Sequence, residues 1–185
     1  MRLGVFGGSF DPPHIGHYLA AVDAAERLGL DRMLWVPTAQ QPLKAGAQHV
    51  ASADQRFRMV QAAVSGNPIF EASRIEIDRP GLSYTVATVQ SLVAEFPGVE
   101  LYLLIGEDAW SRFEEWREPE TIRTLVHIEI LARKTESEFA GRVVEVSSTE
   151  VRARARAGKS VRGFVLDAVA EIIDDVARKA VEKTE

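Results

Sequence analysis

The chain has 185 residues, 46% of them hydrophobic and 26% charged, with a formal net charge of −5 and no cysteine. This is the composition of an ordinary soluble domain; an acidic balance without a basic run argues against nucleic-acid binding through bulk electrostatics, and the lack of cysteine excludes disulfides and thiolate metal sites. No stretch has transmembrane length, and the first residues form a strand pattern rather than a signal peptide, so we expect a cytoplasmic protein with one domain over residues 1–185. We expect no membrane or nucleic-acid partner. The sequence leaves open whether the protein forms a homo-oligomer.

Strand and helix patterns alternate along the chain. In chain order they predict a strand at 3–6, a helix opening at about 15 and running to 28, a strand at 33–36, a helix at 56–64, an extended segment at 69–77, a helix at 84–96, a strand at 101–105, short helices at 107–113 and 119–125, strands at 127–132 and 143–146, and a helix at 165–181. The run at 101–105 does not alternate, which is typical of a strand covered on both faces. The order predicts a doubly wound, Rossmann-like α/β fold: a parallel sheet with helices on both faces, then a C-terminal helical part at about 148–185.

Helical spacing also predicts which side chains face the core. Ser52 and Gln55 form a capping-box signature just before the helix at 56–64. The inward residues expected on three of the helices are Phe57, Val60 and Val64; Val86, Val89, Leu92 and Val93; and Val165, Val169, Ile172, Ile173, Val176 and Ala180. Because ligands of doubly wound folds bind beyond the carboxyl ends of the strands, the first loop, the segment after Pro37 and the turn at Gly106 are expected to converge on one cleft.

The turn between the first strand and the first helix is the most informative segment. It reads Gly7-Gly8-Ser9-Phe10-Asp11-Pro12-Pro13-His14-Ile15-Gly16-His17. Two glycines let a ligand approach the backbone closely, and the helix start offers unpaired N–H groups and a positive dipole end to an anion. His14 and His17 lie on one face of the first helical turn, where both can donate hydrogen bonds to that anion. The turn fits neither the P-loop nor the G-x-G-x-x-G pattern, which argues against a P-loop NTPase or a dinucleotide-dependent dehydrogenase.

A second segment, Ser147-Ser148-Thr149-Glu150-Val151-Arg152, follows a predicted strand and opens another helix. A serine N-cap with an early acid is by itself a common helix start. Together, however, the two segments resemble the H-x-G-H and S-S-T-x-x-R signatures of the nucleotidyltransferase superfamily of adenylyl- and cytidylyltransferases. The resemblance implies that His14, His17 and Arg152 are catalytic. The ATP-binding residues that it implies are Gly7, Gly8, Ser9, Phe10, His14, Gly16, His17, Lys44, Gly106, Ser147, Ser148, Thr149 and Arg152.

These residue types suit adenylyl transfer to a phosphate monoester. Such an acceptor is already ionised near neutral pH, so catalysis reduces to aligning two anionic groups and neutralising charge as it spreads over the pentacoordinate phosphorus. Amides, imidazoles and one guanidinium supply donors rather than a base. We expect Mg²⁺ to arrive with ATP and no metal site on the protein, since no cluster of carboxylates is evident in the sequence.

Three further matches carry the resemblance to a family. Ser83-Tyr84-Thr85, Gly106-x-Asp108 followed by Trp116, and Pro42 with Lys44 resemble motifs of the bacterial nicotinate-nucleotide adenylyltransferases. That family transfers AMP from ATP to nicotinate mononucleotide, giving deamido-NAD and pyrophosphate in NAD biosynthesis; its tryptophan stacks on the nicotinate ring, and backbone N–H groups hold the carboxylate. The pyridine-nucleotide-binding residues that the resemblance implies are Ser9, Tyr84, Thr85, Asp108, Trp116, Arg117 and Arg133.

The sequence also departs from that family, and other readings stay open. Leu43 stands where the family commonly has histidine, Arg117 replaces a frequent aromatic residue, and Thr38 occupies a position often held by asparagine. The alternatives are a dual-specificity or nicotinamide mononucleotide adenylyltransferase, a phosphopantetheine adenylyltransferase, and a nucleotide-binding regulator without catalysis. The last of these predicts erosion of His14, His17 or Arg152, all of which are intact.

Overall fold

The computed structural model describes residues 1–42, 49–131 and 144–182, with no side chains beyond 175. Within these ranges five strands form one parallel sheet in the order β3-β2-β1-β4-β5. Their bounds are β1 Arg2–Gly8, β2 Arg32–Pro37, β3 Phe70–Ala72, β4 Glu100–Gly106 and β5 His127–Leu131. The order reverses at β1, so the predicted doubly wound α/β fold is confirmed, and the carboxyl ends of β1 and β4 mark the place where such folds bind ligands.

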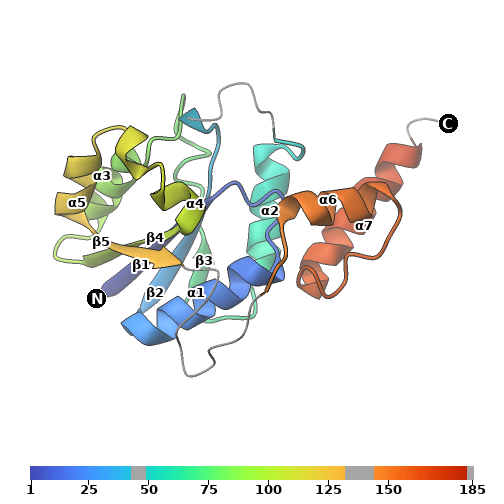
Figure 1. Ribbon diagram of the computed structural model, residues 1–185, viewed down its shortest axis with the longest axis horizontal. Helices are drawn as coiled ribbons and strands as arrows, with labels where there is room; N and C mark the ends of the chain where they lie inside the picture. The colour runs from blue at the N-terminus through green and yellow to red at the C-terminus, as the bar shows by residue number, and fades with distance from the viewer. Residues whose placement is uncertain (43–48, 132–143, 183–185) are drawn as a thin grey trace.

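Helices cover both faces of this sheet. Their bounds are α1 Ile15–Leu28, α2 Ala53–Val64, α3 Thr85–Glu95, α4 Glu107–Trp110, the 3₁₀ turn η2 Phe113–Glu115, α5 Pro119–Leu125, α6 Ser148–Arg156 and α7 Asp167–Glu182. Figure 1 shows α3 and α5 on one side of the sheet, α1 on the other, and α6 with α7 extending away beside α2. Among the described residues, no helix combines the length and the apolar character that crossing a membrane requires.

Alternation along the strands divides the core into two layers. Leu3, Val5 and Leu103 point toward the layer that α3 and α5 complete, whereas Phe6 and Leu104 point toward the layer beneath α1 and α2. Both faces of β1, β2 and β4 are therefore apolar, which explains why β4 shows no alternation in its sequence. Burial of both faces fixes the strand register, because a one-residue slip would exchange the two layers.

A third apolar cluster attaches the C-terminal helices. Met59 and Ala63 of α2 pack with Val151 of α6 and with Val165 and Val169 around the start of α7. The backbone of the preceding segment also reaches α1, since Ile15 N donates to the Phe164 carbonyl at 2.9 Å. This packing brings the start of α6 next to the start of α1, although the two are far apart in sequence.

Several local predictions need correction. The extended segment predicted at 69–77 is a strand only over β3, since 75–77 form a turn; residues 144–146 are irregular rather than a strand; and the helix predicted at 107–113 divides into α4 and η2. Val93 is 36% exposed rather than inward, and Phe57 is half-buried beneath the Arg74 guanidinium, 4.9 Å from its ring centroid. Val165 is buried but precedes α7, and the side chains of Val176 and Ala180 lie outside the described residues.

Candidate active site

The turn between β1 and α1 is tightly packed. A Cβ atom on Gly8 would lie 3.0 Å from the Phe10 ring, so only glycine fits at that point without a shift. Phe10 itself has φ 45° and is 1% exposed, with its ring 5.3 Å from Phe6 and 5.2 Å from Trp35 between centroids. Phe10 was predicted to bind ATP; because its ring is part of the core, any such contact comes from its backbone.

His14 and His17 form a reciprocal cap at the start of α1. His17 Nδ1 accepts from the His14 N–H at 3.1 Å and His14 Nδ1 accepts from the His17 N–H at 3.4 Å, with the rings stacked 3.7 Å apart. When Nδ1 accepts, the proton of a neutral imidazole sits on Nε2. A Cβ on Gly16 would meet His14 Nδ1 at 3.1 Å, so the glycine leaves room for this arrangement. The cap therefore makes both rings Nε2–H donors on one face of the helix start.

The ring of His17 packs edge-on against Phe6 and Phe10, with centroid distances of 6.1 and 5.2 Å. Burial lowers the pKa of His17 well below 6.5, and the neighbouring His14 lowers it further. The lowered pKa favours the neutral form of His17, which leaves its Nε2–H as a potential hydrogen-bond donor.

The second predicted segment lies directly on the first. Arg152 Nη1 donates to the Asp11 carbonyl at 2.5 Å, and Ser148 Oγ donates to the Pro12 carbonyl at 2.8 Å. Arg152 Nη2 also donates to Thr149 Oγ1 at 3.1 Å, while Ser147 Oγ caps α6 by accepting from Glu150 N at 3.1 Å. The sequence predicted that these segments act together, and the structure brings them into hydrogen-bond contact.

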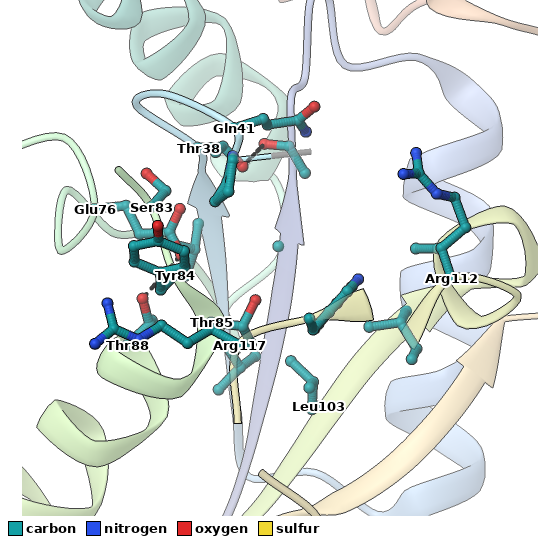
Figure 2. A pocket seen from close by; sticks show the side chains of 18 of the residues that line it. Thr38, Gln41, Glu76, Ser83, Tyr84, Thr85, Thr88, Leu103, Arg112 and Arg117 are labelled. Atoms are coloured by element: carbon teal, nitrogen blue, oxygen red, sulfur yellow. Dashed lines mark hydrogen bonds between the residues drawn. The ribbon is translucent and has the colours of Figure 1, made fainter. Parts of the chain in front are cut away.

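A cavity of about 860 Å³ opens beyond the carboxyl ends of β1, β2 and β4. Gly7 and Gly8, the residues after Pro37, and Gly106 all contribute to its wall, so the three segments converge as expected. Figure 2 shows Tyr84, Thr85 and Arg117 on one side of this cavity and Arg112 across it, with Thr38 and Gln41 at a third edge. The volume suits a nucleotide-sized ligand.

One wall of the cavity combines an aromatic surface with a helix start. Trp116 is half-buried and packs 5.2 Å from Phe113, while Arg117 places its guanidinium 4.8 Å from the centre of the Tyr84 ring. Tyr84 is the N-cap of α3, and its side chain makes no capping hydrogen bond, so the amides at the start of the helix are not capped by Tyr84 and could donate to a ligand. An aromatic face beside such amides suits a flat ring that carries an anionic group.

The predicted residues fall into three groups. Those that line the cavity are Gly7, Gly8, Tyr84, Thr85, Gly106, Asp108, Trp116 and Arg117. Those that lie along the turn and the start of α6, outside that lining, are Ser9, Phe10, His14, Gly16, His17, Ser147, Ser148, Thr149 and Arg152. Lys44 and Arg133, together with the departure at Leu43, lie outside the described residues.

Sequence reasoning missed a buried polar network in the cavity wall itself, to which Glu76, Ser83 and Thr88 contribute (Figure 2). Thr88 Oγ1 donates to Glu76 Oε1 and accepts from Arg79 Nη2, both at 2.8 Å, and Ser83 Oγ accepts from Ala39 N at 3.0 Å. Burial raises the pKa of Glu76, whereas hydrogen bonds from Thr88 and Ser83 and the nearby Arg79 lower it. Glu76 was expected in a strand and Thr88 within an amphipathic helix, so neither carried a signal of its own.

Comparisons with known proteins first define the class. A family model described as cytidylyltransferase-like matches residues 5–154, a span that runs from β1 into α6 and contains both segments predicted to bind phosphate. The chain is therefore a nucleotidyltransferase.

Individual relatives identify the family within the nucleotidyltransferases. Proteins of Gemmatimonas aurantiaca and Thermus thermophilus, both named nicotinate-nucleotide adenylyltransferase, are 44% and 43% identical to this chain; each alignment covers 94% of the chain and 90% and 97% of the relative. The chain belongs to the nicotinate-nucleotide adenylyltransferase family.

Solved structures agree in fold. The crystal structure of a nicotinate-nucleotide adenylyltransferase from Vibrio parahaemolyticus aligns with a TM-score of 0.75 at 19% identity, covering 94% of this chain and 99% of that one. The Plasmodium falciparum nicotinic acid mononucleotide adenylyltransferase, solved in complex with NaAD, aligns with a TM-score of 0.73 at 12% identity over 95% of each chain.

Proposed function

We propose that the protein transfers AMP from ATP to nicotinate mononucleotide and releases pyrophosphate, giving deamido-NAD for NAD biosynthesis. The observation that carries the proposal is the hydrogen bond between Arg152 and the Asp11 carbonyl, which joins segments 141 residues apart into one anion site with His14 and His17. The adjoining cavity with Trp116 and the start of α3 supports a flat, anionic acceptor. Family membership supports nicotinate mononucleotide among such acceptors.

The reaction needs alignment and charge neutralisation. A phosphate oxygen of the acceptor attacks the α-phosphorus of ATP; the new P–O bond forms as the bond to the bridging oxygen breaks, and pyrophosphate leaves with that electron pair. Amides of the turn from Ser9 to Asp11 and the Nε2–H groups of the two imidazoles would donate to the phosphoryl oxygens, while Arg152 would neutralise charge on the triphosphate. A neutral His17 fits this role, because donation and not proton abstraction is required.

We propose that Mg²⁺ enters the site with ATP, where it would help to neutralise the charge of the triphosphate and of the departing pyrophosphate. Among the described residues no group of three or more His, Asp or Glu side chains is gathered in a way that could hold a metal ion. Turnover is expected to require added Mg²⁺ and to stop when EDTA removes it, while the folded state of the protein survives the same treatment.

The direct test measures pyrophosphate release with ATP and Mg²⁺ and, separately, nicotinate mononucleotide, nicotinamide mononucleotide and phosphopantetheine. We expect the highest kcat/KM with the nicotinate compound and none with phosphopantetheine. Arg152→Gln serves as the matched inactive control, since it keeps a polar side chain but loses the charge. Equal or better turnover with either of the other acceptors would contradict the proposed substrate.

A further inference from the structure

Arg56 is a buried arginine on α2 that reaches two loops of the site from behind. It is 1% exposed, and its Nη1 donates to the Ser9 carbonyl at 2.8 Å while Nη2 donates to the Ala39 carbonyl at 3.4 Å. Its Nε atom is also buried and has no hydrogen-bond partner within the described parts of the chain. Burying a guanidinium costs desolvation free energy, so we expect a buried arginine at this position to have a specific role.

The surroundings of Arg56 form a hub of three chain segments. The Asp11 carboxylate is also buried and accepts from Val50 N at 2.7 Å and from Ala51 N at 3.1 Å, and His49 Nδ1 lies 4.0 Å from it. Burial lowers the pKa of Arg56, whereas the negative charge of Asp11 raises it. The hub therefore ties the turn after β1, the loop after β2 and the segment entering α2 around the buried, oppositely charged side chains of Arg56 and Asp11.

The same two loops present side chains to the ligand side. Gln41 Nε2 donates to Ser9 Oγ at 2.8 Å, and the Ala39 N–H donates to Ser83 Oγ, next to Tyr84 at the cavity wall. Ser9 and Ala39 are thus held from behind by the guanidinium and linked in front by residues of the site. Loss of the guanidinium would release both loops at once.

The Ser9–Phe10 peptide is the point most sensitive to this support. Phe10 has φ 45°, a left-handed backbone conformation that residues other than glycine rarely adopt. Among the described residues, Glu118 is the other non-glycine residue with positive φ. A strained turn of this kind persists only when its surroundings determine it, and a charge-assisted hydrogen bond to the Ser9 carbonyl fixes the orientation of that peptide.

We propose that Arg56 is a positioning residue that holds the Ser9 turn and the Ala39 loop in the geometry required to bind the triphosphate of ATP. The inference rests on the proposed function for its kinetic consequences, but it does not depend on which acceptor is used. Arg56 acts through two carbonyl groups and touches no reacting atom. A planar guanidinium reaches both carbonyls together, which the single ammonium of lysine does not.

The test compares Arg56→Met and Arg56→Lys with two controls on the same helix. Arg58→Met removes an exposed arginine two residues away, and Val60→Ala weakens the core packing of α2 without removing a hydrogen bond to either loop. For each protein, calorimetry gives the Kd for ATP, steady-state kinetics give kcat and both KM values, and thermal unfolding gives Tm. The probe for binding is ATP itself in the presence of Mg²⁺.

We expect Arg56→Met to weaken ATP binding and to lower kcat/KM for ATP by on the order of 10²-fold, the usual effect of a small misplacement in a catalytic site. KM for the acceptor should change much less. Arg56→Lys should retain the fold, and its ATP affinity and kcat/KM for ATP should lie between the values of wild type and those of Arg56→Met. Val60→Ala should lower Tm with normal kinetics, and Arg58→Met should change neither.

A purely structural role would give a different pattern. If Arg56→Met behaves like Val60→Ala, with a lower Tm and unchanged ATP affinity, the proposal is overturned. If Arg56→Met does not fold, Arg56→Lys decides, because wild-type ATP affinity and kcat/KM in that variant would also overturn it. A wild-type protein that turns over none of the acceptors would contradict the proposed function, yet the comparison of ATP affinities would still test Arg56.

Discussion

The proposed phosphate end of the site comprises His14, His17 and Arg152, and the proposed acceptor end comprises Tyr84, Trp116 and Arg117. At the phosphate end most groups are held by contacts from other parts of the chain, whereas at the acceptor end the side chain of Arg117 is exposed. His17 is packed among aromatic rings, and the turn before it is bound by Arg152, Ser148 and Arg56. At the acceptor end, the side chain of Arg117 is 59% exposed and lies on the surface of the Tyr84 ring. A buried network around Thr88, in the wall of the cavity, reinforces this end.

This difference has a chemical reason. Charge that develops at phosphorus is stabilised only by donors that are already in place, so the phosphate end gains from rigidity. Recognition of a flat ring depends on surface contact and tolerates adjustment of side chains at the rim. We therefore expect substitutions at the phosphate end to act on kcat and those at the acceptor end to act on KM for one substrate.

The largest effect is expected from His17→Ala. Removing one preorganised donor lowers kcat by about 10²–10³-fold, with much of the ATP affinity retained because the turn amides and Arg152 remain. His17→Asn is the matched variant, since its side-chain oxygen can still accept from the His14 N–H while Nε2–H is lost. Near-normal kcat in either variant, measured by pyrophosphate release, would contradict the assignment.

Trp116→Ala tests the acceptor end of the site, where we expect an effect on KM for one substrate. Loss of a stacking surface costs about 1–3 kcal/mol, or roughly 5- to 150-fold, and we expect this loss in KM for the pyridine nucleotide. KM for ATP should stay close to wild type, and Trp116→Phe should recover much of the loss because it keeps an aromatic face. Equal rises in both KM values would argue that Trp116 is a core residue next to Phe113 rather than a contact for the ring.

Much of this organisation is visible in the sequence, because strands buried on both faces and glycine-rich turns have strong local signals. The run at 101–105 and the turn that begins at Gly7 are examples: each was placed correctly from residues adjacent in sequence. The convergence of the Gly8, Pro37 and Gly106 ends followed from topology alone.

The sequence-based predictions are wrong where contacts between distant parts of the chain determine the local structure. The segment at 69–77 has the composition of a strand, yet it pairs with β2 only as far as Trp35 and then turns, with Arg74 bonded to Asp54 and Asp78. Arg56 and Thr88 are polar residues on buried helix faces, and a periodicity rule assigns such residues to solvent. Their partners, Ser9 and Glu76, are not neighbours in sequence, so local patterns carried no sign of them.

The Thr88 network, which lies in the cavity wall, offers a test that measures stability. Thr88→Val leaves the buried Glu76 carboxylate and the Arg79 guanidinium without their shared hydroxyl, which should cost about 1–3 kcal/mol in the free energy of unfolding. Thr88→Ser keeps the hydroxyl and should recover most of that loss in urea denaturation. If Thr88→Val unfolds at the same urea concentration as wild type, the network does not stabilise this wall.

The neutral state of His17 predicts a pH dependence of stability. The unfolded chain takes up a proton on this residue near pH 6.5, whereas the folded protein resists protonation because burial and His14 lower the pKa. The stabilising contribution is therefore complete above pH 6.5 and declines as pH falls below it, by up to about 1.4 kcal/mol per pH unit. The difference in unfolding free energy between wild type and His17→Gln isolates this slope, since groups common to both, such as Glu76 with its raised pKa, cancel. Parallel pH profiles for the two proteins would show that His17 is protonated equally in both states.

The smallest effect is expected at Arg117, where the exposed rim of the acceptor end meets solvent. Its guanidinium over Tyr84 should favour a carboxylate over an amide on the bound ring, although the ion pair with Glu118 at 3.5 Å and screening by water weaken the field. We expect Arg117→Gln to lower the ratio of kcat/KM for nicotinate over nicotinamide mononucleotide by up to about fivefold, corresponding to about 0.2–1 kcal/mol.

Two controls test whether the charge of Arg117 causes this effect. Added salt should reduce the difference between wild type and Arg117→Gln, because salt screens charge, and Arg117→Lys should retain the ratio, because it keeps the charge. An unchanged ratio in Arg117→Gln at low salt would assign the discrimination to the amides at the start of α3, which a side-chain substitution at the rim does not alter.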